Sequence, residues 1–162
     1  MPDGRTHKLV GAGAGAVYAG YRAKEESDPH WWIEVAGGAF GGYLGGMCPD
    51  VLEPAISSWH RGTAHSCAAG GGIVVLKNGL KAFGDACRES AENCKAIEMI
   101  QQGNVFVPAI LDPFSLVVLG IFELLWRFLA GFVNGFAAGY VSHLVLDATI
   151  GKRSIPLLTK RF

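Results

Sequence analysis

The stretch GGAFGGYLGG, residues 37–46, decides the fold because its glycines recur with the period of a helix. Six of them form two series with i, i+4 spacing, Gly37, Gly41 and Gly45 and then Gly38, Gly42 and Gly46. A doubled GxxxG pattern follows later in the chain, at Gly131, Gly135 and Gly139. Periodic glycines of this kind form a groove in which the backbone of a neighbouring helix can lie. The sequence therefore predicts a bundle of closely packed helices.

Apolar segments on both sides of this stretch extend the helical pattern over most of the chain. Five are predicted to be helical: Lys8–Tyr21, Trp31–Met47, Ala64–Leu80, Val105–Trp126 and Phe128–Ile150. The polar region Lys81–Gln102 carries mixed charges and predicts one amphipathic or solvent-facing helix. No alternation typical of strands occurs. We predict one all-α domain, residues 1–162, a compact bundle of about five Gly-rich, largely membrane-embedded helices plus one polar helix.

The composition favours a membrane protein over a soluble enzyme. Half of the 162 residues are hydrophobic, 23 are glycine and only 17% are charged. Small residues at this frequency suit helices that pack within a bilayer, where backbones must approach closely. The formal net charge of zero provides no basic field, so no nucleic-acid partner is expected. The four cysteines are too few and too scattered for a disulfide scaffold, and we expect reduced thiols.

Basic residues near both ends of the chain predict its orientation. Arg5 and Lys8 precede the first apolar segment, and four more basic residues follow the last, Lys152, Arg153, Lys160 and Arg161. The positive-inside rule then places both termini of a multi-pass membrane protein in the cytoplasm. This requires an even number of crossings, whereas five apolar segments are present. We expect the fourth segment not to cross, because Pro108 and Pro113 interrupt it.

Two polar clusters interrupt the apolar segments. The first lies within CPDVLEPAISSWHRGTAHS, residues 48–66, and supplies Asp50, Glu53, His60, Arg61 and His65. The second is SHLVLD, residues 142–147, in which the histidine and the aspartate are spaced i, i+4 and share one face of a helix. Imidazole and carboxylate groups are costly to bury without a partner, so these clusters indicate a site. His and Asp together favour a metal centre.

An antiparallel helical layout brings these clusters to one end of the bundle. His7 opens the first apolar segment, Asp50 closes the second, and His60 and His65 lead into the third. His143 and Asp147 reach the same end if the chain before them crosses the membrane an even number of times after the third segment. The basic residues at both termini also require an even number of crossings. The predicted ligands of a divalent ion, with zinc favoured, are His7, Asp50, His60, His65, His143 and Asp147. Simpler roles are open to single residues: a turn at Asp50, a helix cap at His60 and an exposed His7.

These motifs resemble those of the bacterial inner-membrane metal-dependent hydrolases, a family that includes the LexA-binding membrane hydrolases. Its members carry an N-terminal His, then PDID followed by His-Pro, then HRGxTHS, and then GYxSHxxxDxxTxxG. The matching positions are His7, Pro49, Asp50, Pro54, His60, Arg61, Gly62, His65, Ser66, Gly139, Tyr140, Ser142, His143, Asp147, Thr149 and Gly151. The specific part of this match is HRGxxHS followed at a distance by SHxxxD.

The resemblance implies a hydrolase of the inner membrane in which the metal activates a water molecule. Glu53 is then the candidate general base, Arg61 would hold an anionic group such as phosphate, and Asp50 would act both as ligand and in catalysis. Asp147 would either bind the metal or orient His143. A site at the membrane edge favours a lipid-like or phosphoester substrate, with membrane lipid as the partner.

The sequence departs from the family pattern at three positions. Leu52 stands where the family has its second Asp, Glu53 where it has His, and Ala64 where it usually has Thr. Because Leu52 cannot bind a metal, we predict a mononuclear site. The region of about residues 81–127 is predicted to be an insertion relative to the compact family pattern, forming a partner surface or a substrate lid.

Two other functions are compatible with the sequence. In the first, the protein is a non-catalytic membrane protein that forms homo-oligomers through its Gly-rich helix faces, and the His and Asp residues form a structural metal site or hydrogen-bond cluster. Alternatively, the Gly-rich helices and the broken fourth segment would suit a membrane-perturbing effector. Polar residues within the apolar runs have structural predictions: Glu123 and Asn134 as interhelical contacts, Arg127 as a snorkelling side chain and His30 as an interfacial loop residue.

Overall fold

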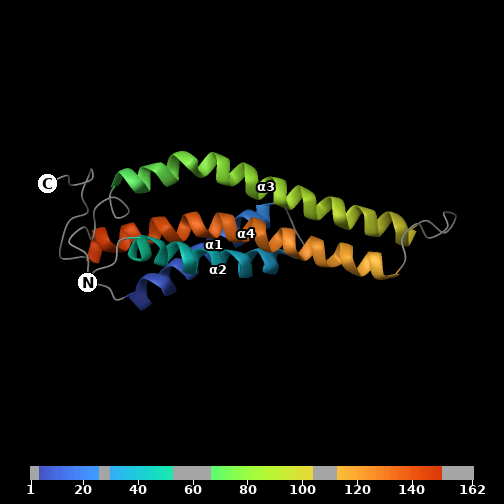
Figure 1. The fold of residues 1–162 in the computed structure, drawn as a ribbon, viewed down its shortest axis with the longest axis horizontal. Coiled ribbons are helices and arrows are strands. Elements are labelled where there is room, and N and C mark those ends of the chain that lie inside the picture. The colour runs from blue at the N-terminus through green and yellow to red at the C-terminus, as the bar shows by residue number, and fades with distance from the viewer. Residues whose placement is uncertain (1–3, 26–29, 53–66, 104–112, 151–162) are drawn as a thin grey trace.

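The computed structural model describes residues 4–25, 30–52, 67–103 and 113–150. They form four helices, which are α1 Gly4–Glu25, α2 Trp31–Leu52, α3 Cys67–Gly103 and α4 Pro113–Ile150 (Figure 1). Consecutive helices run antiparallel, so α1 begins, α2 ends, α3 begins and α4 ends at the same end of the bundle (Figure 1). No strand occurs in the described ranges, and the prediction of an all-α fold is confirmed.

The four helices of the described ranges do not confirm the predicted total of about five plus one polar helix. α3 joins the third apolar segment to the polar region, since no proline lies between Cys67 and Gly103. α4 contains the end of the fourth segment and all of the fifth, and it starts at Pro113. A proline suits the first helical position because its φ is already helical and its missing N–H has no partner there. The four antiparallel helices bring the end of α4 back to the end of the bundle where α1 begins. Which segments cross a membrane stays a prediction.

Glycine faces hold α2 between α1 and α4. A Cβ atom added on one face of α2, at Gly37, Gly41 or Gly45, would overlap a main-chain carbonyl oxygen of α4. On the other face, a Cβ at Gly42 would overlap the carbonyl oxygen of Gly11 on α1. The α4 glycines at 131, 135 and 139 lie in the same way against the backbone of α2. These faces are filled within one chain, which is why the three helices approach so closely.

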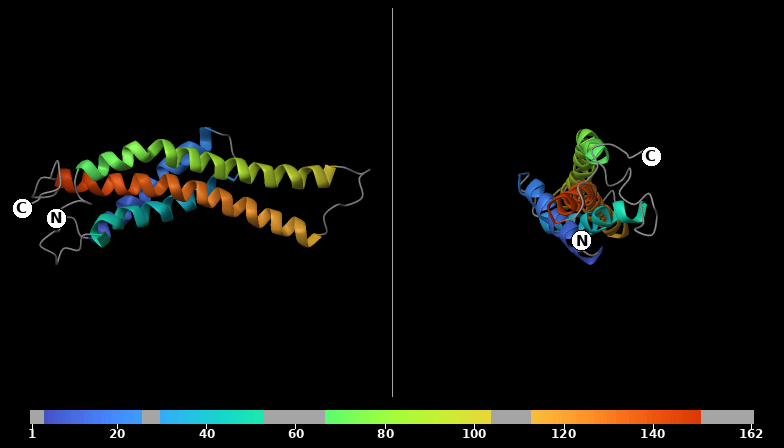
Figure 2. Two further views of the ribbon diagram at one scale, coloured as in Figure 1. Left: turned by 45° about the horizontal axis from the view of Figure 1, so that its top comes forward. Right: turned by 90° about the vertical axis from the view of Figure 1, so that its left-hand side faces the viewer.

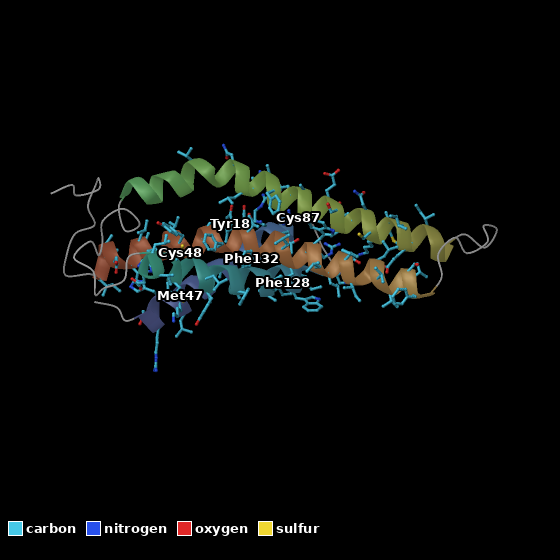
Figure 3. All side chains as sticks on the ribbon, in the orientation of Figure 1. Tyr18, Met47, Cys48, Cys87, Phe128 and Phe132 are labelled. Carbon is cyan, nitrogen blue, oxygen red and sulfur yellow. The ribbon has the colours of Figure 1, made fainter. Side chains whose placement is uncertain are left out.

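Aromatic side chains lie beside the contact between α2 and α4. The ring of Phe40 on α2 lies 6.2 Å from that of Phe128 and 6.0 Å from that of Phe132, centroid to centroid. Both α4 residues are labelled in Figure 3. Tilted rings at this separation add favourable contacts where the glycines provide no side chains. The result is a contact between α2 and α4 with backbone at its centre and aromatic rings at its edge.

α3 and α4 form a hairpin that is longer than α1 and α2. They contain 37 and 38 residues, against 22 in each of the first two helices. The hairpin extends beyond the region covered by α1 and α2 (Figure 2). Its far part carries the second half of α3 and the first half of α4, which together include most of the region 81–127. The backbone of α3 packs along α4, and among the described residues long side chains such as Arg22 and Arg88 connect it to α1 and α2.

The distribution of side chains is the reverse of that in a water-soluble bundle. Half of the buried apolar residues in the described ranges are alanines, namely Ala19, Ala23, Ala91 and Ala130. The buried polar or charged residues are His7, Glu34, Arg88, Glu123, Arg127, Asn134, His143 and Asp147. Large apolar side chains such as Val17, Phe40, Phe114 and Leu125 are exposed. One described helix, α4, contains a segment long and apolar enough to cross a membrane, Phe114–Ile150.

Candidate metal centre

Four of the six predicted ligands meet at the end of the bundle where α1 begins and α4 ends. His7 lies near the start of α1, Asp50 in the last turn of α2, and His143 and Asp147 near the end of α4. Met47 and Cys48 of α2, which are labelled in Figure 3, precede this end. The exposed fractions of His7, His143 and Asp147 are 4%, 1% and 3%. We refer to His7, Asp50, His143 and Asp147 as the His–Asp cluster.

Glycines on the facing helices allow these side chains to come together. Gly46 of α2 lies so close to α1 that a Cβ there would be 2.6 Å from the carbonyl oxygen of His7. Gly139, one turn before His143 on α4, lies against the backbone of Gly42. A larger side chain at Gly46 or Gly139 would push α1 or α4 away from α2. The glycine pattern that decides the fold therefore also sets the separation of the imidazoles.

The ring of His143 is oriented by the main chain. Its Nδ1 lies 2.6 Å from the carbonyl oxygen of Gly46. A carbonyl only accepts, so Nδ1 carries the proton and a neutral ring has its lone pair on Nε2. This Nε2 faces two carboxylates, 3.7 Å from Oδ1 of Asp50 and 3.9 Å from Oδ2 of Asp147. A lone pair and carboxylate oxygens repel one another unless a cation, either a proton or a metal ion, lies among them.

His7 completes the buried part of the cluster. Its ring stacks on that of His143, with 3.8 Å between centroids and 20° between planes. Its Nε2 lies 3.3 Å from Oδ1 of Asp147, and its Nδ1 is buried without a hydrogen-bond partner among the described residues. The two oxygens of Asp147 thus face one imidazole nitrogen each. This places two nitrogen donors and one carboxylate around a common point.

The three buried residues fit a divalent metal ion. His7, His143 and Asp147 each offer a ligand atom, and these atoms all lie within 4.8 Å of one another. Ligand atoms of a tetrahedral zinc ion are about 3.3 Å apart, since each bond is about 2.0–2.1 Å long. The measured separations of 3.3 and 3.9 Å are close to that value. Two histidines and one carboxylate are also a donor set of catalytic zinc sites, which keep a fourth position open.

Asp50 lies at the edge of the His–Asp cluster. Its side chain is 37% exposed, whereas that of His143 beside it is fully buried. A carboxylate there can provide a fourth ligand or accept a proton from a water molecule. Leu52, which occupies a family aspartate position, is 64% exposed.

The remaining predicted site residues lie outside the described residues. Glu53, His60, Arg61 and His65 belong to the segment 53–66, which connects the end of α2 to the start of α3. Both of those helix ends are at the same end of the bundle as the His–Asp cluster (Figure 1). Their assignment to metal binding or catalysis stays a prediction.

A second polar group, the ionic cluster of Arg22, Glu34, Asp85 and Arg88, was not foreseen from the sequence. Glu34 and Arg88 are buried, whereas the side chain of Asp85 is 41% exposed. Arg88 of α3 donates to both carboxylate oxygens of Glu34 on α2, at 2.8 and 2.6 Å. Asp85 accepts from Arg88 at 3.2 Å and from Arg22 of α1 at 2.7 Å. The available signal was a lone glutamate in the glycine-rich second segment. Its partner is 54 residues away, so periodicity alone could not identify it.

Three further polar residues correct or refine the sequence reading. Arg127 does not snorkel: it is 2% exposed, and its Nε donates to Glu123 at 3.0 Å. Nδ1 of His30 lies 3.0 Å from the same glutamate oxygen, which ties the residue before α2 to α4. Gly84 of α3 lies against the amide of Asn134, so Asn134 is at a helix contact as predicted. The i, i+4 spacing of Glu123 and Arg127 was the signal for their pairing.

No protein-family model, curated protein or solved structure matches this chain. The His–Asp cluster, with two imidazoles and two carboxylates from three helices, is the basis on which a function can be assigned.

Proposed function

We propose that this protein is an integral membrane hydrolase that uses one divalent metal ion, with zinc favoured, held by His7, His143 and Asp147. The observation that carries the proposal is the orientation of His143. Gly46 accepts the Nδ1 proton, so Nε2 presents its lone pair to the carboxylates of Asp50 and Asp147. A purely structural pair would place an N–H between the ring and a carboxylate at about 2.7–2.9 Å. A metal ion among these atoms removes the repulsion and satisfies all of them.

The side-chain distribution supports a membrane location. Polar groups lie inside the bundle and large apolar groups outside, which is the arrangement that a bilayer favours. Only 22% of the most apolar window of α4 is buried within the protein, whereas the core helix of a soluble protein is mostly buried. We infer that α4 crosses the membrane and that the antiparallel helices make the protein multi-pass. The basic residues at both ends then favour cytoplasmic termini at the inner membrane.

The residues of the cluster have distinct roles in this proposal. A divalent ion bound there supplies Lewis-acid activation of water and of the scissile bond. Gly46 fixes the ring of His143, the stacked rings fix His7, and Asp147 contacts both imidazoles. Asp50, the most exposed member, is placed to accept a proton from the attacking water. Glu53 and Arg61 keep their predicted roles as general base and anion-binding residue.

The substrate class follows from the position of the site. The His–Asp cluster lies at one end of a bundle whose outer surface is apolar, which puts it near a membrane surface if α4 crosses the bilayer. Lipid headgroups and their phosphoesters are found at that depth. We therefore propose a lipid-like or phosphoester substrate, which agrees with what the resemblance to inner-membrane hydrolases implies.

A structural role is the second candidate function. The stacked imidazoles and the hydrogen bond to Gly46 join α1, α2 and α4 at one point. In a non-catalytic membrane protein, these contacts would serve only to hold the three helices together. Exchange-labile water on the bound ion supports the enzyme. A metal ion whose four ligands all come from the protein supports the structural role. A cluster that holds protons and binds no metal also supports it.

The experiment compares detergent-purified wild-type protein with His143→Ala. Wild-type protein should carry one zinc ion per chain and hydrolyse a phosphoester presented in mixed micelles, while the variant should lack both metal and activity. Asp50→Asn is the matched control: it should retain the metal and lose most of the hydrolysis. Wild-type protein that binds no metal after exposure to zinc would overturn the proposal. Membrane sedimentation that withstands high salt tests the location, since apolar attachment is insensitive to salt.

A further inference from the structure

Exposed aromatic side chains gather where α1 ends and α2 begins, at the opposite end of these two helices from the His–Asp cluster. Tyr21 lies near the end of α1, and Trp31 and Trp32 are the first two residues of α2. Their exposed fractions are 60%, 52% and 57%. This level is about halfway along the α3–α4 hairpin (Figure 1). We call Tyr21, Trp31 and Trp32 the aromatic belt.

Helix geometry sets the distance between the aromatic belt and the His–Asp cluster. An α-helix rises about 1.5 Å per residue, so Trp31 and Asp50 are about 29 Å apart along α2. The hydrocarbon core of a bilayer is about 30 Å thick. If the His–Asp cluster lies at one membrane surface, as proposed above, the aromatic belt therefore lies at the other. This step rests on the proposed membrane location.

The charged residues of α2 and α4 mark the same two levels. α2 has no Asp, Glu, Lys or Arg between Glu34 and Asp50. α4 has none between Arg127 and Asp147, which are about 30 Å apart by the same rise per residue. The comparison concerns these two helices, since the sequence of α3 carries lysines in the corresponding range. An uncharged stretch of this length on two packed helices suits a hydrocarbon layer, in which charged side chains are costly.

Ionic contacts between helices concentrate near the aromatic belt. Nδ1 of His30, the residue before Trp31, lies 3.0 Å from the buried carboxylate of Glu123 on α4. Glu34, about one turn further along α2, pairs with Arg88 of α3. Charged groups cost less near a membrane surface than at its centre, because water and headgroups lie close to them. The aromatic belt is therefore at a depth that also suits these charges.

We propose that Tyr21, Trp31 and Trp32 bind the phospholipid headgroup layer of the membrane surface opposite the His–Asp cluster. Trp and Tyr are favoured at membrane interfaces, because each has an apolar ring and an N–H or O–H donor. The rings contact the upper part of the acyl chains, and the donors bind ester and phosphate oxygens. A protein partner would require no fixed distance from the His–Asp cluster, whereas a bilayer does. The spacing of about 29 Å therefore selects lipid as the occupant.

Depth-dependent quenching of tryptophan fluorescence tests this contact. The full-length protein with Trp59→Phe and Trp126→Phe retains only Trp31 and Trp32, and it is reconstituted into phosphatidylcholine vesicles. Lipid brominated near the headgroup should quench this fluorescence about twofold more than lipid brominated near the chain ends, as expected for rings at the interface. Stronger quenching by the deep bromine would overturn the proposal. So would the absence of quenching by both lipids, which would show that protein covers the rings.

Phe40→Trp provides a matched control for depth. It is introduced into a variant in which Trp31, Trp32, Trp59 and Trp126 are all replaced by phenylalanine. Phe40 is 52% exposed, as Trp31 is, and it lies about 14 Å further along α2, near the centre of the bilayer. Its fluorescence should be quenched more strongly by the deep bromine. Identical depth profiles for the two proteins would contradict the assignment of the aromatic belt to the interface.

Thiol labelling tests whether the two ends of α1 lie at opposite membrane surfaces. Arg5 and Lys24 are both exposed, near the start and the end of the helix. In a variant whose four cysteines are replaced by alanine, Lys24→Cys should react with a membrane-impermeant maleimide in intact bacterial spheroplasts. Arg5→Cys should react only after lysis. Reaction of both variants without lysis would overturn the placement.

Zinc content and hydrolysis measured on the same vesicles separate this inference from the proposed function. Deep quenching of Phe40→Trp without any quenching of Trp31 and Trp32 would contradict the aromatic belt and leave the membrane location standing. The expected depth profiles in protein that binds no zinc would contradict the metal centre only.

Discussion

The two polar clusters of this protein, each with a buried centre, differ in how their charges are matched. In the ionic cluster, arginine donors lie 2.6 and 2.8 Å from the carboxylate of Glu34, and Asp85 accepts at 2.7 and 3.2 Å. In the His–Asp cluster, the nitrogens and carboxylate oxygens are 3.3, 3.7 and 3.9 Å apart. Charge-assisted hydrogen bonds are shorter, at about 2.7–2.9 Å. The Glu34–Arg88 pair is therefore matched at hydrogen-bond distance, whereas the His–Asp cluster is spaced for an added cation.

This difference explains why the two clusters have different consequences for the fold. The Glu34–Arg88 pair is buried and bidentate, and with Arg22 and Asp85 it connects α3 to α1 and α2. The His–Asp cluster joins α1, α2 and α4, which the glycine faces already hold together. We therefore expect substitutions in the ionic cluster to act on stability, and those in the His–Asp cluster to act on metal binding.

The largest effect is expected from breaking the ionic cluster. Arg88→Met should lower the free energy of unfolding by about 3–5 kcal/mol, because it leaves the buried carboxylate of Glu34 without its bidentate partner. Chemical unfolding of the detergent-solubilised protein, followed by circular dichroism, measures the change. Combining Arg88→Met with Glu34→Leu should recover most of the loss. A single variant within 1 kcal/mol of wild type (on the order of one ordinary hydrogen bond) would show that the pair is not needed for packing α3.

Zinc should stabilise the protein through the other cluster. At a free concentration of about 100 times the dissociation constant, zinc should raise the free energy of unfolding by about 2.7 kcal/mol, since it binds only the folded chain. His143→Ala should show no such increment, and neither should Asp147→Asn if its oxygens are ligands. Unfolding with zinc and with a chelator gives the increment for each variant. An increment that survives His143→Ala would place the metal elsewhere.

The same small change at two glycines should separate the clusters. Gly37→Ala and Gly45→Ala each place a methyl group against a carbonyl oxygen of α4 and should cost about 1–3 kcal/mol of stability. Only Gly45→Ala, beside Gly46, should also weaken zinc binding, by about tenfold or more. Zinc titration and unfolding measure both quantities. Gly13→Ala, which has open space, is the control and should be neutral or slightly stabilising. Equal zinc affinities of the first two variants would contradict this.

The smallest expected effect is the pH dependence of the zinc increment. A metal binds imidazole only after its proton has left, so protons compete with zinc and the increment falls as the pH drops. Each imidazole proton that zinc displaces should change the increment by about 1.4 kcal/mol per pH unit. Unfolding with and without zinc at two pH values measures this slope. Loss of zinc stabilisation at the higher pH would reverse the expected sign.

Sequence reasoning predicted the all-α fold class and part of the candidate site. The glycine series of residues 37–46 predicted a close helix contact, and the i, i+4 spacing of His143 and Asp147 put both on one face. The antiparallel layout predicted that His7 and Asp50 would lie at the same end, and the structure places all four together. These inferences succeed because helical periodicity and direction are local properties of the chain.

Only the tertiary structure decided how the helices end and which distant groups meet. Pro113 starts a helix that the sequence reading had interrupted, and α3 continues through a change from apolar to polar composition. The hydrogen bond from His143 to Gly46 joins residues 97 apart, and it fixes the nitrogen that faces the carboxylates. The sequence by itself determined the spacing of small and polar residues along each helix. The register and rotation of one helix against another come from the fit of all the contacts at once, which local periodicity does not contain.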